Sequence, residues 1–360
     1  MRYLLGSKRT LIVRGPASLR LLGGQATALG APLESRKVVV RQEKQLPIET
    51  TSEADLDVLM GESGSILEVD GSTIPRSWHS ALNALMEMEQ GKVVIVGAQD
   101  VGKSTLCTFL ANGLLKGGVM PELVDADIGQ ADIGPPTTLG KAIVSEYVSS
   151  LLELSPLVMI FIGDTSPNRA QSKLVEGIRR LSNTGKQALT IINTDGWVLD
   201  PEALTYKVEL IKAVQPDLVL GITTGQELES ILSGTSALSM RIEAPASILA
   251  RSRSDRRQIR TAGYRRFLDG GKTMKYLLRE TQLKLPNDLQ SIQSVRISEL
   301  RNLIVGLLDA QGYLLQIGIL QSLDEDSFRV YSRSTDHLRE IELGNVKLST
   351  DGVELGYVEW

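Results

Sequence analysis

The sequence predicts an α/β protein in which a central domain with a largely parallel sheet is flanked by N-terminal and C-terminal all-β domains. Residues 1–77 hold short β-branched segments such as "TLIVRG" and "KVVVRQ", separated by glycine, proline and Asp-Gly turns. Residues 78–274 alternate helical patterns with apolar strands such as "KVVIVG", "LVMIFIG" and "QALTIIN", which is typical of parallel sheets. Strand patterns return over residues 275–360. These three stretches are the predicted domains.

The composition excludes several classes of protein. A net charge of -4 and a pI near 5.5 argue against wholesale coating of nucleic acid, although they leave room for a local basic patch. A single cysteine, Cys107, excludes an intramolecular disulfide and a four-cysteine zinc site, and two histidines leave little room for histidine-based metal sites. No apolar run reaches the roughly 18 residues that span a bilayer. We therefore expect a cytoplasmic protein, or a nuclear one in a eukaryote.

The stretch "GAQDVGKS" fits the phosphate-binding loop G-x-x-x-x-G-K-[ST], with a buried strand before it and a helical pattern after it. Lys103 is expected to reach the β- and γ-phosphates of a nucleotide, and the Ser104 hydroxyl to bind Mg²⁺. The predicted nucleotide-binding residues are Gly97, Ala98, Gln99, Asp100, Val101, Gly102, Lys103, Ser104 and Thr105.

Two acids, Asp125 and Asp127, come at the end of the next strand, in "VDADIGQ". Ligands of open α/β sheets bind at the carboxyl ends of the strands. If the strand continues to Asp127, the two carboxylates share a face, because residues two apart in a strand point the same way. One carboxylate could then complete the Mg²⁺ shell and one could accept a proton. The pattern leaves the division of these roles open, and it also fits a plain acidic turn.

Trp197 and an arginine-rich segment are the other candidates. Trp197 follows the strand "QALTIIN" in a chain that is only 4% aromatic, so it could stack on a base or simply anchor a helix start. Residues 251–267 read "RSRSDRRQIRTAGYRRF" and contain arginine but no lysine. Arginine dominance favours bidentate contacts to phosphate over an ordinary solvated helix face.

Together, the motifs "GAQDVGKST", "DADIGQADIGPP", "FIGDTSP" and "TDGW" and the arginine segment resemble the polynucleotide 5'-hydroxyl kinases. This family includes the RNA kinase subunit of eukaryotic mRNA 3'-end cleavage factor and the nucleolar kinase of ribosomal RNA processing. The resemblance covers nearly the whole chain and implies a central P-loop kinase domain. It implies a Mg²⁺-dependent transfer of the γ-phosphate of ATP to the 5'-hydroxyl of RNA, with DNA left open as an acceptor, and protein partners in RNA processing.

The resemblance also implies roles for individual residues around the reacting phosphate. Asp127 is similar to the general base that receives the proton of the 5'-hydroxyl, and Gln130 lies beside the γ-phosphate. Lys103 matches the phosphate-binding lysine, while Ser104 and Asp127 are the implied Mg²⁺ ligands.

Two further elements of the family bind the substrates from outside the phosphate loop. Thr194 and Trp197 resemble a clasp that holds the terminal nucleotide, although the clasp reads "TDGW" here. Arg256 and Arg260 match the R-x-x-x-R spacing of a lid whose arginines close over ATP. Arg253 and Arg257 have the same spacing, so the register of the lid stays open.

Three other functions compete with this hypothesis. An ATP-binding scaffold of an RNA-processing complex would have the same motifs but no turnover. A GTP-dependent assembly factor would be expected to carry an N-K-x-D motif, which does not occur in the sequence. A small-molecule kinase would not obviously need two flanking β domains or a tryptophan clasp.

Overall fold

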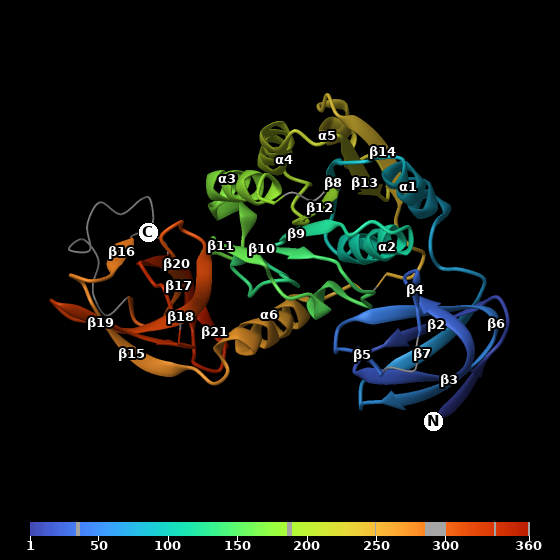
Figure 1. Ribbon diagram of the computed structural model, residues 1–360, viewed down its shortest axis with the longest axis horizontal. Coiled ribbons are helices and arrows are strands. Elements are labelled where there is room, and N and C mark those ends of the chain that lie inside the picture. Colours follow the sequence, from blue (N-terminus) through green and yellow to red (C-terminus); the bar gives the residue numbers. More distant parts are fainter. Residues whose placement is uncertain (34–36, 186–188, 249, 285–299, 335, 359–360) are drawn as a thin grey trace. The chain divides into compact units, whose positions relative to one another are not determined.

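The computed structural model of the protein describes all residues except 34–36, 186–188, 249, 285–299, 335 and 359–360 (Figure 1). The chain forms two compact units. The first unit contains Met1–Leu123, Ile143–Leu154 and Gly185–Ser252, and the second contains Val124–Ala142, Ser155–Thr184 and Arg253–Trp360.

The N-terminal part of the first unit is an antiparallel sheet, as predicted. Its strands are β1 (Arg2–Leu5), β2 (Arg9–Arg14), β3 (Ala17–Ala28), β4 (Ala31–Pro32), β5 (Val38–Val40), β6 (Gln45–Met60) and β7 (Ser65–Asp70). They follow the order β4-β3-β6-β2-β7, with β1 on β6 and β5 on β3. Alternate residues of β6, including Leu46, Ile48 and Leu56, are buried, which is the period of a strand with one face on a core.

The first unit also holds the parallel strands β8 (Gly91–Gly97), β12 (Leu189–Thr194), β13 (Leu218–Thr223) and β14 (Leu238–Glu243). The helices of this unit are α1 (Arg76–Met86), α2 (Lys103–Lys116), α4 (Pro201–Val214) and α5 (Glu229–Ser233), with a 3-10 turn η1 (Leu151–Glu153). Val93 to Val96 are inaccessible to solvent, so both faces of β8 are covered, as expected of a parallel strand.

The full order of the central sheet is β11-β10-β9-β12-β8-β13-β14. Its remaining strands are β9 (Glu122–Ala126), β10 (Thr138–Ile143) and β11 (Val158–Phe161), of which β10 and β11 pair antiparallel. The prediction of a largely parallel sheet is therefore confirmed. Helix α3 (Gln171–Ser182) follows β11 after the short turn η2 (Pro167–Arg169).

Helix α2, which follows the phosphate-binding loop, is tied to its surroundings by a buried amide. Asn112 is inaccessible to solvent, and its Nδ2 donates to the carbonyl oxygens of Leu29 (3.0 Å) and Val148 (2.8 Å). Its Oδ1 accepts from the Val148 N–H at 3.1 Å. Because every one of these groups is buried, the amide fixes α2 against the N-terminal β domain.

The second unit ends in a second β domain, again as predicted. Its strands are β15 (Lys272–Leu277), β16 (Gln282–Lys284), β17 (Leu303–Leu308), β18 (Leu314–Leu323), β19 (Ser327–Ser332), β20 (Glu340–Leu348) and β21 (Glu354–Tyr357). The order is β15-β19-β18-β17-β20-β16, with β21 on β20. The arginine-rich segment forms helix α6 (Arg253–Leu268), whose Tyr264 and Leu268 are buried in one core with Ile304 and Ile317 of this domain.

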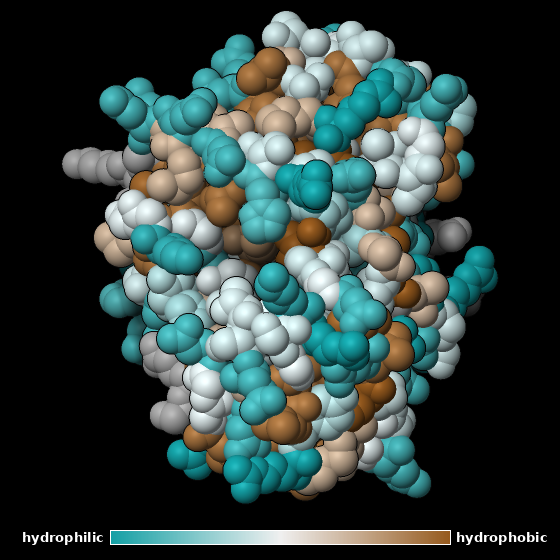
Figure 2. All heavy atoms as spheres, turned by 90° about the vertical axis from the view of Figure 1, so that its right-hand side faces the viewer, coloured by the Kyte–Doolittle hydropathy of each residue, from teal (hydrophilic) through white to brown (hydrophobic). Residues whose placement is uncertain are grey.

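On the face drawn in Figure 2, hydrophobic side chains are scattered among hydrophilic ones. Among the described residues, no helix is long and apolar enough to cross a membrane.

Candidate functional site

The phosphate-binding loop joins β8 to α2 and curls around its own lysine. Lys103 is 7% exposed, and its Nζ donates to the carbonyl oxygens of Gly97 (3.1 Å) and Ala98 (2.8 Å). Gly102 adopts a left-handed φ of 100°, which glycine reaches at no steric cost, and Asp100 has a φ of 59°. The lysine and the N-terminus of α2 thus provide the positive charge and backbone donors that bind an anion.

The Ser104 hydroxyl, which is the expected Mg²⁺ ligand, lies in the first turn of α2. It accepts from Nδ2 of the buried Asn193, at the end of β12, at 3.3 Å. Within the described residues, no group of three or more histidine, cysteine or acidic side chains could hold a metal ion without other ligands.

The predicted clasp residues lie at the end of β12, where Thr194 is the last strand residue, and in the loop after it, which holds Trp197 and is shaped by a buried acid. Asp195 accepts from Lys207 Nζ (2.7 Å), from Tyr206 Oη (3.0 Å) and from the Trp197 N–H (2.9 Å). Lys207 and Asp195 are 0% and 3% exposed at their side chains, so this is a buried ion pair. The ion pair holds Asp195 in place, and Asp195 in turn fixes the backbone at Trp197 through its N–H.

Trp197 itself is half-buried and braced on one face. Its ring stacks on Tyr206 with centroids 5.9 Å apart and an angle of 28° between the planes, and its Nε1 donates to Asp200 Oδ2 at 2.7 Å. Thr194, in contrast, is fully buried, and its hydroxyl donates to the Ile95 carbonyl at 2.8 Å. The two predicted clasp residues therefore differ. The Trp197 ring is partly accessible to solvent, whereas the Thr194 side chain is buried and hydrogen-bonds to β8.

The clasp loop and the phosphate-binding loop meet backbone to backbone. A β-carbon at Gly196 would lie 2.8 Å from both the N and the Cα of Gln99, closer than real β-carbons approach other atoms. Only glycine fits at this contact without displacing one of the two loops. The position of Trp197 is thus mechanically linked to the loop around Lys103.

Arg251 connects the phosphate-binding loop to the N-terminal β domain. Its backbone N–H and its guanidinium each donate to the Asp100 carboxylate at 3.2 Å, and its Nε donates to the Glu43 carbonyl at 3.0 Å. This contact holds Asp100 in its left-handed conformation from outside the loop.

In the second unit, the structure separates the two aspartates at the end of β9, because Asp125 lies within the strand and Asp127 follows it. The strand ends at Ala126, so the alternation does not continue to Asp127. Asp125 is 1% exposed and its Oδ2 accepts from the N–H groups of Asp132 (2.6 Å) and Ile133 (3.2 Å). Burial, with the nearby charge of Asp132, raises the pKa of Asp125 to about 7. Asp125 therefore stabilises the loop that follows β9 through hydrogen bonds to its backbone.

Asp127 lies closer to solvent, where a reacting group can meet it. Its Oδ1 accepts from the N–H groups of Gly129 (3.1 Å) and Gln130 (3.0 Å), which closes a tight turn. This turn orients the carboxylate and places Gln130 directly beside it. Of the two acids, Asp127 is the better placed for chemistry on a substrate.

The lid arginines divide by exposure. Arg256 and Arg260 are half-buried, whereas Arg253 and Arg257 are exposed. Arg260 makes a bidentate pair with Glu354, from Nε to Oε1 at 2.5 Å and from Nη2 to Oε2 at 2.9 Å, and Glu354 is 4% exposed. Arg260 is thus held by the C-terminal β domain in this structure.

The sequence patterns did not predict Lys207 or Glu354 as site residues, whereas Arg251 falls in the arginine-rich segment without a role of its own. Lys207 has a signal in the sequence, because it falls on the apolar face of α4 together with Ala203 and Leu210. Glu354 has no local signal, since its partner is 94 residues away.

We predict that Gly196→Ala weakens ATP binding by about tenfold, because the new methyl group must displace the backbone at Gln99, and overpacking of this kind costs about 1–3 kcal/mol. Titration with a fluorescent ATP analogue measures the effect. Gly23→Ala is the matched control, because its β-carbon would come no closer than 4.0 Å to another residue. Unchanged ATP affinity in Gly196→Ala would show that the two loops are not coupled.

Comparisons with known proteins find relatives over most of the chain. Residues 97–270 match the family model described as "mRNA cleavage and polyadenylation factor CLP1 P-loop". A polyribonucleotide 5'-hydroxyl-kinase of Pyrococcus furiosus is 27% identical over 340 residues, covering 79% of this chain and 96% of the relative. One of Methanocaldococcus jannaschii is 25% identical, covering 79% of this chain and 95% of the relative.

A solved structure shares the whole fold. The structure of a wild-type Clp1p–Pcf11p complex matches with a TM-score of 0.76 at 14% identity, covering 96% of this chain and 97% of the matched one. The family model spans the phosphate-binding loop, the clasp and the arginine-rich helix, and the archaeal relatives match over most of their length. Over residues 97–270 the chain is thus similar to the CLP1 P-loop family, and over most of its length it is similar to archaeal polyribonucleotide 5'-hydroxyl-kinases.

Proposed function

We propose that the protein is an ATP-dependent polyribonucleotide 5'-hydroxyl kinase, which transfers the γ-phosphate of ATP to the 5'-hydroxyl of RNA. The observation that carries this proposal is the contact between the phosphate-binding loop and the clasp loop at Gln99 and Gly196. It joins a site for the donor's phosphates to an aromatic ring that can stack on a base of the acceptor. The archaeal relatives that match over most of the chain carry the same activity in their names.

In the proposed reaction, Asp127 accepts the proton of the 5'-hydroxyl as its oxygen attacks the γ-phosphorus. A new P–O bond forms to the RNA, the bond between the γ-phosphorus and the bridging oxygen breaks, and ADP leaves. The tight turn through Gly129 and Gln130 N–H groups orients the Asp127 carboxylate for this role. Gln130 is proposed to lie beside the transferring phosphoryl group.

Lys103 and the backbone N–H groups of residues Gly97 to Thr105 bind the ATP phosphates in this proposal, and Ser104 and Asp127 would hold Mg²⁺. When bound, Mg²⁺ neutralises phosphate charge. Trp197 stacks on the terminal base with the face that Tyr206 leaves uncovered, and Thr194 supports the clasp through its bond to Ile95. Arg256 and Arg260 form the lid, because they are the half-buried pair.

An ATP-binding scaffold without turnover is the second candidate. The structural neighbour with the same fold is a Clp1p–Pcf11p complex, which supports protein partners for this chain as well. We propose that such partners bind a protein that is also an active kinase.

Asp127→Asn should abolish transfer while leaving ATP binding largely intact, because the amide cannot accept the proton. Lys103→Ala should lose both transfer and much of the ATP affinity. Transfer to a 5'-hydroxyl RNA from γ-labelled ATP, measured beside ATP titrations, separates the two effects. Asp326→Asn, at an exposed turn of the C-terminal domain, is the control and should behave as wild type. Normal turnover by Asp127→Asn would remove its assignment as the base.

Arg260 needs a test that separates chemistry from stability. Arg260→Ala should lower the free energy of unfolding by about 3 kcal/mol, because it leaves the buried Glu354 carboxylate unpaired. The double variant Arg260→Ala/Glu354→Gln removes that buried charge and should recover most of the stability.

If Arg260 acts on the transition state, the recovered double variant should still transfer phosphate about 100-fold or more slowly than wild type. Denaturant unfolding and single-turnover kinetics on the same samples give both quantities. Wild-type rates in the stable double variant would show that Arg260 only positions the lid helix.

A further inference from the structure

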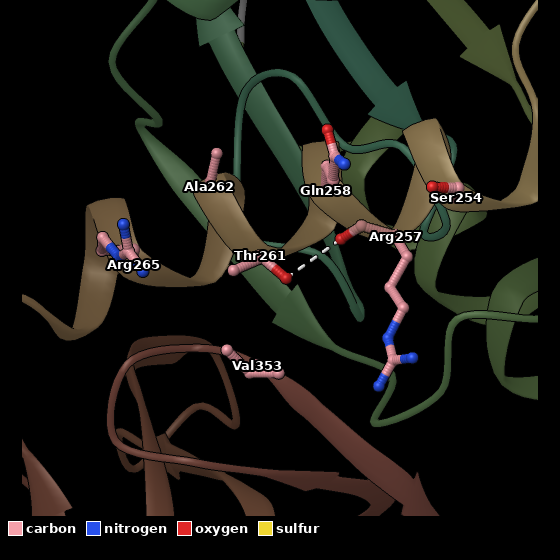
Figure 3. Close-up of a pocket in the computed structure, with 7 residues that line it drawn as sticks. All are labelled: Ser254, Arg257, Gln258, Thr261, Ala262, Arg265 and Val353. Atoms are coloured by element: carbon pink, nitrogen blue, oxygen red, sulfur yellow. Dashed lines mark hydrogen bonds between the residues drawn. The ribbon is translucent and has the colours of Figure 1, made fainter.

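Helix α6 has a second face, which the proposed reaction does not use. A hollow of about 460 Å³ runs between this face and the loop before β21 (Figure 3). It is lined by Ser254, Arg257, Gln258, Thr261, Ala262, Arg265 and Val353, a set with two cations, three side chains that can donate hydrogen bonds as neutral groups, and no carboxylate.

The two arginines of this hollow carry charge that the protein does not balance. Among the described residues, neither pairs with a carboxylate: Arg257 donates to the backbone carbonyl of Glu354, and Arg265 Nε donates to that of Asp351 at 3.4 Å. Arg260, one turn from Arg257, is in contrast matched by the Glu354 carboxylate. A guanidinium has five N–H donors, so one bond to a carbonyl leaves most of its capacity for a ligand.

The spacing of the donors suits an extended anion. Arg257, Thr261 and Arg265 recur every four residues and so form one stripe along the helix. Eight residues separate the two arginines, which is about 12 Å along a helix axis. Both side chains are exposed, so a ligand can reach them without any rearrangement of the core. A chain of phosphates could contact both ends of the stripe at once.

We propose that this groove, formed by α6 and Val353, binds the phosphodiester backbone of the RNA downstream of its 5'-terminal nucleotide. The inference rests on the proposed function, which supplies a single-stranded polyanion as the substrate. Charge complementarity favours phosphate over other ligands, and backbone contacts of this kind are independent of sequence. Helix α6 then carries the lid arginines on one face and binds the RNA with another face.

The test uses Arg265→Ala, because Arg265 is exposed and lies outside the lid pair. Binding of a 12-nucleotide, 3'-fluorescein-labelled RNA is measured by anisotropy between 50 and 200 mM salt, beside phosphate transfer to a 5'-hydroxyl dinucleotide. We expect affinity for the 12-mer to fall about fivefold and the slope of log K against log salt to shrink by about 0.7, the value for one lost phosphate contact on a single strand. Transfer to the dinucleotide, which does not extend into the groove, should be unchanged.

Arg20→Ala, at an exposed position of the N-terminal sheet, removes the same charge elsewhere and should change neither quantity. Wild-type affinity and salt slope in Arg265→Ala would overturn the proposal, as would an equal loss for the dinucleotide, which would place Arg265 at the 5' end. An Arg265-dependent affinity for poly-glutamate with no effect on RNA would also overturn it, since the groove would then bind an acidic protein segment. Absence of transfer by the wild-type protein would instead refute the proposed function.

Discussion

The lack of a side chain at Gly196 is the constraint on which the first unit's site depends. Strands β8 and β12 are parallel neighbours, with Asn193 opposite Ile95, so the loops that leave their carboxyl ends emerge side by side. Because Gly196 has no side chain, the clasp loop can contact the backbone of Gln99. The buried ion pair between Asp195 and Lys207 fixes the same loop. The aromatic ring and the phosphate-binding loop are therefore held in one geometry before either substrate arrives, which is what pre-organised phosphoryl transfer requires.

Buried charge serves positioning in both units. The pairs Asp195–Lys207 and Arg260–Glu354 bury carboxylates whose desolvation offsets much of the attraction, so they add little net stability. Each ion pair fixes an element that bears a side chain of the proposed site: the loop of Trp197 in one case and α6 in the other. Tyr264 and Leu268 add apolar contacts, so α6 and the C-terminal sheet share a core. Helix α6 is thus part of a domain and not a loose segment.

Much of this architecture was predictable from the sequence. Continuous apolar runs such as Val93 to Val96 identify buried parallel strands, and glycine spacing with Lys103 identifies the phosphate-binding loop, because both signals are local. The separate roles of Asp125 and Asp127 were not predictable, since they depend on where β9 ends. The role of Glu354 could not be predicted from the sequence, because its partner Arg260 lies in a distant segment of the chain. The register that we propose for the lid rests on the partial burial of Arg256 and Arg260, which helical spacing alone does not predict.

The proposed function requires this site to move a phosphoryl group to a free 5' end. The most direct measurement incubates the wild-type protein with Mg²⁺, γ-labelled ATP and two RNAs of one sequence, one ending in a 5'-hydroxyl and one already 5'-phosphorylated. We expect label only on the 5'-hydroxyl RNA, and a 5'-phosphatase should release that label. Bound ATP with no label on either RNA would contradict the proposed function and identify an ATP-binding scaffold instead.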